Sequence, residues 1–293
     1  MQARHTARII LIAGLGVFAA ALVGLLVSGH HGLRPSTDST DLIGLDDAIV
    51  PALVGLLLVR LVPPRAERLD AMPGMTRSTA ARQAWQLVAI AAGLPVALYV
   101  AVLAGAPDET VGGLWALSKV LVFLLLTWGL FRPDWLGTPG IWWPDAGWRW
   151  WGPLPALAAF ALLTSVGPVA GQHPDAADYP DPALLAIGAT VTFLTANVTE
   201  ELFYRVILQT RLEAVLGRWA AIVSTALLFA LLHLPTHGQT GSALGGLPLT
   251  LAAIVVFQGT TGVFLGYLWS RYRNVWAQIT AHTIINTLPL VFL

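Results

Sequence analysis

Nine apolar runs, separated by short stretches rich in proline, glycine and aspartate, dominate the sequence. A helix needs about 20 apolar residues to cross the hydrocarbon core of a bilayer, and most of these runs meet or approach that length. The runs cover residues 8–28, 43–62, 84–105, 113–131, 152–170, 183–208, 218–236, 247–270 and 275–293. We therefore predict an all-α fold, a polytopic transmembrane helical bundle of about eight to nine spans.

Composition supports a membrane protein and excludes several functions. Only 11% of the residues are charged, whereas a soluble domain carries about a quarter. The formal net charge is zero, so nothing indicates a nucleic-acid partner. Cysteine is absent, which excludes disulfides, thiolate metal sites and cysteine nucleophiles. The partner expected from composition is the lipid bilayer.

Arginine occurs at the N-terminus and then in every second loop. These residues are Arg4, Arg8, Arg60, Arg65, Arg68, Arg77, Arg82, Arg132, Arg149, Arg211, Arg218, Arg271 and Arg273. Acidic loops such as 36–47 and 175–181 fall on the opposite side, with Arg34 and Lys119 as the only basic residues there. Basic loops stay in the cytoplasm, so we predict a cytoplasmic N-terminus in a multi-pass plasma-membrane protein. Lys119 lies near the end of its run, where its stem can extend to the interface.

Two adjacent glutamates lie deep inside an apolar run. Glu200 and Glu201 come about seventeen residues into ALLAIGATVTFLTANVTEELFYRVIL, and charges within the bilayer are costly and mark functional sites. Glu201 and Arg205 are spaced i and i+4, so they share a helical face and can form an ion pair. Glu200 then points about 100° away from that pair.

Two histidines also lie within apolar runs. His233 follows Phe229 by one helical turn, and His282 precedes Asn286 at i and i+4, so we expect the latter pair to converge. Glu200 precedes Gly217 by 17 residues and His233 follows it by 16. A helical hairpin turning at Gly217 would bring both side chains to nearly the same height. His282 reaches that level, in the cytoplasmic half of the bilayer, if residues 206–218 project about two helical turns into the cytoplasm. The alternative is that these polar groups only hold helices together by hydrogen bonds.

The patterns EExxxR, FxxxH and HxxxN, in this order on separate helices, resemble the signature of the CAAX protease and bacteriocin-processing enzyme (CPBP) family. This family includes the type II CAAX prenyl endopeptidases and is often grouped as Abi-type. The resemblance covers residues 183–293. It implies a helical membrane protease whose conical cavity opens to the cytoplasm, with residues 151–293 as the catalytic core and the four spans in 1–150 as accessory helices.

The resemblance also implies roles for individual residues. Glu200 corresponds to the catalytic glutamate, and Glu201 and Arg205 correspond to its supporting pair. The remaining site residues are His233, His282 and Asn286.

A glutamate sheltered from bulk water suits a general base that activates water. In this interpretation Glu200 is the base, His233 positions the water, and His282 with Asn286 forms an oxyanion hole. The family is commonly labelled metalloprotease, and a second interpretation places Zn²⁺ on Glu200, His233 and His282, although HExxH is absent.

The expected activity is intramembrane hydrolysis of peptide bonds in membrane-associated proteins or peptides, lipidated ones included, near the cytoplasmic face. Two other functions fit the same residues. One is a non-catalytic membrane binding or immunity protein of the same fold. The other is a proton-coupled transporter, because buried Glu, His and Arg also form proton relays, although such transporters usually show paired broken helices in two halves.

Overall fold

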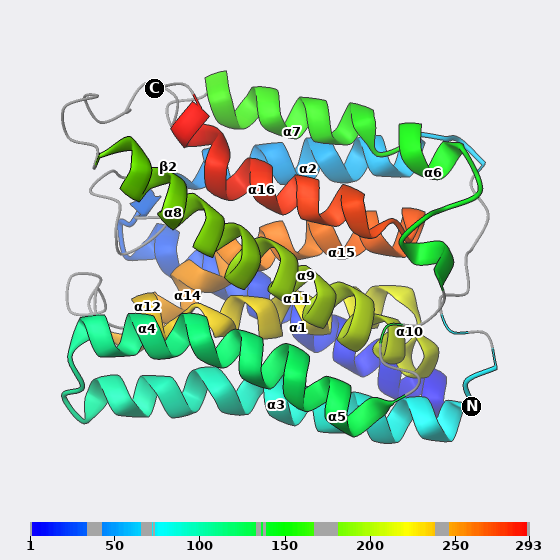
Figure 1. Cartoon of the computed structure of the whole chain (residues 1–293), viewed down its shortest axis with the longest axis horizontal. Helices are drawn as coiled ribbons and strands as arrows, with labels where there is room; N and C mark the ends of the chain where they lie inside the picture. The colour runs from blue at the N-terminus through cyan, green and yellow to red at the C-terminus, as the bar shows by residue number, and fades with distance from the viewer. Residues whose placement is uncertain are drawn as a thin grey trace.

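The computed structural model describes residues 2–33, 43–65, 72, 74–132, 136, 139–166, 181–237 and 246–291. Within them the chain is a bundle of roughly parallel and antiparallel helices (Figure 1). The first half contains α1 (Gln2–Val27), α2 (Leu45–Leu61), α3 (Arg77–Leu103), α4 (Asp108–Ser118), η1 (Lys119–Leu126), α5 (Thr127–Phe131), η2 (Pro139–Ile141) and α6 (Trp148–Trp151). The second half contains α7 (Leu154–Val166), α8 (Pro182–Thr192), η5 (Phe193–Val198), α9 (Thr199–Glu201), η6 (Leu202–Gln209), α10 (Thr210–Leu216), α11 (Arg218–Leu232), α12 (Leu234–His237), α14 (Leu247–Ile254), η7 (Val255–Gly259), α15 (Thr260–Tyr272) and α16 (Val275–Val291).

The extended structure in the described residues is a single two-residue antiparallel pair. Strand β1 (Gly32–Leu33) pairs with β2 (Ile43–Gly44) just before α2 begins. This pair is too small to form a layer, so the predicted all-α fold class is confirmed.

Each of the nine predicted apolar runs contains helix, but the predicted number of spans is only partly supported. Six helices in the described part of the chain are long and apolar enough to cross a membrane. They are His5–Val27, Arg77–Leu103, Thr110–Phe131, Pro182–Leu216, Arg218–Thr236 and Leu247–Tyr272. The helices α2, α7 and α16 are described over only 17, 13 and 17 residues. Whether these three cross the bilayer stays a prediction.

The centre of the bundle is formed by α11 and by the continuous helix from α14 through η7 to α15. About 61% of the apolar window is buried in each of these two spans, against 17–22% in the other four. α11 packs against α15, α1 and α3, and α15 also packs against α2. The long helix from α8 to α10 lies across α16 and beside η1. Helices from both halves of the chain therefore surround the segment that carries Glu200.

The hairpin predicted at Gly217 is present. Gly217 has φ +77°, a conformation that favours glycine, and it separates α10 from α11. The helix before it spans 35 residues, which at about 1.5 Å per residue is about 50 Å and exceeds a hydrocarbon core of about 30 Å. This length fits the predicted extension of residues 206–218 beyond the bilayer.

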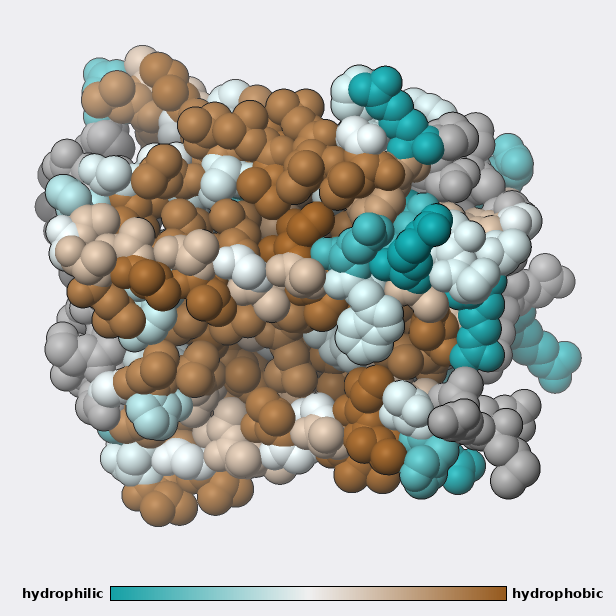
Figure 2. Space-filling model, turned by 90° about the horizontal axis from the view of Figure 1, so that it is seen from below, coloured by the Kyte–Doolittle hydropathy of each residue, from teal (hydrophilic) through white to brown (hydrophobic). Residues whose placement is uncertain are grey.

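Basic residues from several turns gather at the end of the bundle where the N-terminus lies. Polar contacts there join Arg149 to the Tyr272 carbonyl, Arg77 to the Val215 carbonyl, and Arg273 to Glu213. Figure 2 shows an apolar face with its hydrophilic side chains concentrated toward that same end. The acidic loops 36–47 and 175–181 lie largely outside the described residues, and Arg34 and Arg68 lie wholly outside them.

We expect the arginine-rich end to face the cytoplasm. Because the chain has no cysteine, single cysteines can be placed at the exposed residues Ser78, at the start of α3, and Ser28, just after α1. An impermeant thiol reagent should label the Ser28→Cys variant in intact cells and the Ser78→Cys variant only after permeabilisation. The reverse labelling pattern would show that the predicted orientation is wrong.

Candidate active site

The helix that carries the paired glutamates is locally widened on both sides of them. η5 and η6 are π-helical segments, and the single α-turn α9 between them contains Glu200 and Glu201. π-helical insertions rotate and displace side chains relative to a regular helix and are frequent at functional sites. Glu200 is 1% exposed and Glu201 is fully buried, so both carboxylates need partners within the protein.

Glu201 has two such partners. Its Oε2 lies 3.3 Å from Arg205 Nε, which confirms the predicted i, i+4 ion pair, and its Oε1 lies 2.8 Å from His282 Nδ1. The Arg205 guanidinium also lies 4.7 Å from the ring centroid of Phe229. A carboxylate on Nδ1 fixes the orientation of an imidazole and leaves Nε2 for other chemistry. Glu201 therefore orients His282 as well as neutralising Arg205, a contact that the motif spacing did not indicate.

Glu200 pairs with a residue that was not predicted to be in the site. Lys119 Nζ lies 2.8 Å from Glu200 Oε1, and the Lys119 side chain is fully buried. The prediction that Lys119 extends to the interface is thus wrong, because a buried carboxylate compensates its charge. An ammonium group inside the apolar run KVLVFLLL was the sequence signal for this role.

His233 ends α11 beside the same carboxylate. Its Nδ1 lies 3.0 Å from the Phe229 carbonyl, one turn earlier, and its ring packs edge-on against Phe229 and Trp115. A carbonyl only accepts, so Nδ1 carries the hydrogen, and in the neutral ring Nε2 is the acceptor nitrogen. The backbone carbonyl of Phe229, the first residue of FxxxH, therefore fixes the tautomer of His233.

Asn286 takes part in a separate amide contact. Its Nδ2 donates to Asn197 Oδ1 at 2.6 Å, and Asn197 Nδ2 donates to Thr283 Oγ1 at 3.1 Å. His282 and Asn286 thus lie on the same part of α16 but bond to different residues of the long helix. Asn197 was not singled out from the sequence, although a buried amide in an apolar run, three residues before Glu200, was the available signal.

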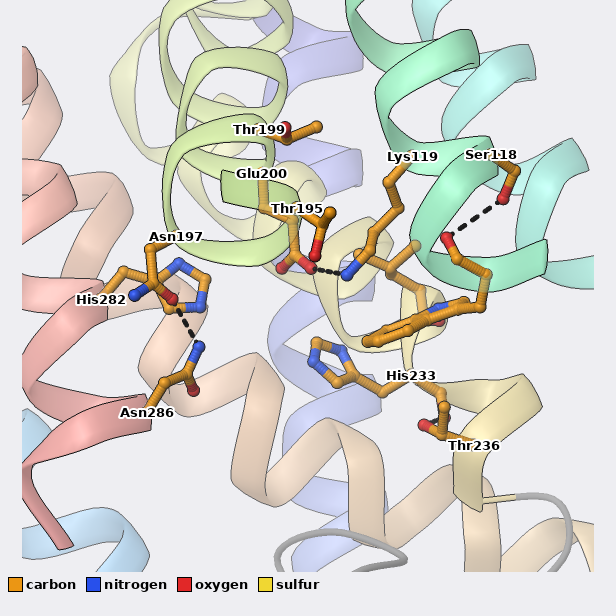
Figure 3. A network of polar contacts seen from close by, with 12 residues as sticks. Ser118, Lys119, Thr195, Asn197, Thr199, Glu200, His233, Thr236, His282 and Asn286 are labelled. Carbon is orange, nitrogen blue, oxygen red and sulfur yellow. Dashed lines mark hydrogen bonds and ion pairs between the residues drawn. The ribbon is translucent and has the colours of Figure 1, made fainter. Parts of the chain in front are cut away.

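The charged residues form one electrostatic cluster. Lys119, His282 and His233 all lie within electrostatic range of the Glu200 carboxylate, which Figure 3 shows between Lys119 and His282. Glu200 Oε2 is buried and has no hydrogen-bond partner among the described residues. Such an atom in a native site is commonly explained by a bound water or by a catalytic role. His233 and Asn286 are partly exposed, so they mark the edge of the site.

The arrangement does not fit the zinc interpretation. Within the part of the chain that the structure describes, no group of three His, Asp or Glu side chains is placed to hold a metal ion. Glu200 Oε1 already bonds the Lys119 ammonium. A divalent cation at Glu200 would also be repelled by Lys119 at short range. We derive no step through zinc, and its presence stays an untested prediction.

Comparison with known families adds one decisive observation. Residues 182–288 match the family model described as type II CAAX prenyl endopeptidase Rce1-like. This segment is an Rce1-like domain. It covers about a third of the chain and confirms the resemblance carried by EExxxR, FxxxH and HxxxN. Searches of curated proteins and of solved structures gave no match.

The Rce1-like domain contains all six predicted site residues, and the structure brings their helices together. The division of the chain into accessory spans (1–150) and a catalytic core (151–293) stays a prediction. Packing does not follow that boundary, because Leu87 and Phe123 share a buried cluster with Phe203, Tyr204 and Phe229.

Proposed function

We propose that the protein is an intramembrane endopeptidase of the CAAX type, with Glu200 as general base. The observation that carries this proposal is the buried Glu200 carboxylate, held by Lys119 through Oε1 and with no hydrogen-bond partner at Oε2 among the described residues. It lies in a segment that matches an endopeptidase family. A carboxylate positioned in this way, with histidines beside it, suits the activation of a water molecule.

In the proposed first step, Oε2 of Glu200 takes a proton from water while the water oxygen bonds to the carbonyl carbon of the substrate. The carbonyl π electrons move to oxygen and form the tetrahedral oxyanion. His233, with its hydrogen on Nδ1, accepts a hydrogen bond at Nε2 from the other O–H of the water and so orients the attack, while that hydrogen stays on the oxygen. The oxyanion then re-forms the carbonyl as the C–N bond breaks, and Glu200 returns its proton to the leaving nitrogen, which restores the carboxylate.

The oxyanion needs hydrogen-bond donors at its position. His282 donates to Glu201 through Nδ1 and, in this scheme, to the oxyanion through Nε2. Asn286 uses one amide hydrogen on Asn197 and has a second hydrogen to donate. In this scheme Arg205 balances the charge of Glu201 and does not contact the substrate.

The proposed substrate class rests on the family match and on the predicted orientation of the site. We propose that membrane-associated proteins or peptides, lipidated ones included, are cleaved near the cytoplasmic face of the plasma membrane. His233 and Asn286, at the partly exposed edge of the site, are where the substrate chain would approach. The surrounding lipid is the second partner in this proposal.

Comparing membrane peptidomes tests the function directly. Cells that produce the wild-type protein should release peptides that are absent from cells producing Glu200→Gln at the same level, and their uncleaved precursors should accumulate in the variant. Identical peptidomes, with the cellular phenotype retained in Glu200→Gln, would favour the non-catalytic binding or immunity function instead.

A further inference from the structure

The chain has one lysine, and it lies in the candidate site. Lys119 is the first residue of the π-helical segment η1, in a helix that precedes the Rce1-like domain by more than 50 residues of sequence. Its Nζ lies 2.8 Å from Glu200 Oε1, with 0% of the lysine and 1% of the glutamate side chain exposed. No step in the proposed hydrolysis yet explains why a cation is buried here.

A tryptophan one turn earlier holds this lysine in place. Lys119 Nζ lies 3.4 Å from the ring centroid of Trp115, an arrangement in which the π face attracts the cation. Trp115 Nε1 also donates to the Leu232 carbonyl at 3.3 Å, and its ring meets His233 edge-on. Trp115 thus contacts Lys119 on one side and, on the other, the end of the helix that presents His233.

Structural stability alone is a weak reason for this ion pair. A buried ion pair is often no more stabilising than well-packed apolar side chains of similar volume, because both charges lose their hydration. The rest of η1 is apolar, and an apolar residue at 119 opposite a neutral residue at 200 would fill the same space. What the pair provides is an ionised glutamate with one oxygen fixed and the other left for hydrogen bonding.

We propose that Lys119 is a positioning residue for Glu200, and that Trp115 couples its placement to that of His233. Lys119 fixes Oε1 so that Oε2 is directed at the water. Trp115 contacts both the ammonium and the His233 ring and so fixes their positions relative to each other. This inference rests on the proposed function. It also means that the active site is incomplete without a helix from outside the Rce1-like domain.

Kinetics of the full-length protein test the proposal, using a substrate found in the peptidome comparison. Lys119→Met keeps a flexible side chain of similar length and removes the charge, whereas Lys119→Arg keeps the charge. Thr127→Val, which removes another buried polar group of the same helix, is the matched control. We expect Lys119→Met to lower kcat by about 10- to 100-fold with KM nearly unchanged, because only the proton-transfer step is affected. Lys119→Arg should recover part of the rate, and Thr127→Val should behave like the wild type.

Infrared difference spectra give a readout that does not require activity. Subtracting the Glu200→Gln spectrum from the wild-type spectrum isolates the Glu200 signal, which should be that of an ionised carboxylate. The same subtraction in the Lys119→Met background should show a protonated acid instead. If the wild type cleaves nothing, the proposed function fails, while this measurement still decides the role of Lys119.

Two results would overturn the positioning role. One is wild-type kcat in Lys119→Met together with an unchanged carboxylate signal. The other is an equal loss of kcat and of melting temperature in Lys119→Met and Lys119→Arg, which would show that the residue only fills space.

Discussion

Replacing Glu200 by glutamine should reduce kcat for peptide hydrolysis by about 10²–10⁴-fold, which is the typical contribution of a positioned general base. Glutamine has nearly the same shape and can still accept a hydrogen bond from Lys119, but it cannot take a proton from water. KM should change little, because the partly exposed residues His233 and Asn286 at the edge of the site remain. The measurement is the initial cleavage rate of purified protein in detergent or reconstituted bilayers, over a range of substrate concentrations.

A matched control separates lost chemistry from a lost ion pair. Glu213 lies on the same long helix and pairs with Arg273, away from the candidate site. Glu213→Gln also removes one carboxylate from an ion pair, so it should leave kcat near the wild-type value. If both variants lose activity to the same extent, helix stability rather than base catalysis explains the result for Glu200.

The structure also predicts an effect of this variant on thermal stability, because Glu200 has a buried partner. Lys119 is buried against it, and removing one member of a buried ion pair costs about 3–5 kcal/mol when the other charge is left unpaired. The glutamine can still accept from Lys119, so we expect a smaller but measurable loss of stability, and expression should be matched before phenotypes are compared.

Much of the fold could be predicted because a bilayer restricts what a chain can do. Backbone groups in hydrocarbon must be bonded within the chain, so an apolar run of sufficient length becomes a helix. The turn at Gly217 was predictable because a glycine lies between two apolar runs. The bonding of the Glu201–Arg205 pair was predictable because an i, i+4 spacing depends on one helix alone.

Contacts between helices distant in sequence were not predictable in this way. Lys119 meets Glu200 across 81 residues, and His282 meets Glu201 across another 81. The rotation of each helix about its axis decides such contacts. The π-helical segments at Lys119 and next to Glu200 change that rotation, and the regular 3.6-residue period of an α-helix does not predict the change. For the same reason His282 and Asn286, although one turn apart, bond to Glu201 and Asn197 and not to each other.

Arg205→Met should cause the largest loss of thermodynamic stability among single substitutions in the site. Arg205 is fully buried, pairs with Glu201 at 3.3 Å and packs over Phe229. Methionine fills similar space without charge, so it leaves the buried Glu201 carboxylate with His282 as its remaining partner. Stranding a buried charge costs about 3–5 kcal/mol, which thermal or denaturant unfolding in detergent would detect as a lowered midpoint.

A double-mutant cycle isolates the charge effect from the change in packing. If the uncompensated carboxylate causes the loss, Arg205→Met combined with Glu201→Gln should be more stable than the sum of the two single losses predicts, by about 0.5–3 kcal/mol. Additive losses would mean that Arg205 stabilises the bundle by packing on Phe229, and that Glu201 depends on His282 alone. The activity of the double variant should nevertheless stay low, because position 201 no longer offers a carboxylate that orients His282 through Nδ1. Stability restored without activity would therefore distinguish the structural role of Arg205 from the proposed role of Glu201 in orienting His282.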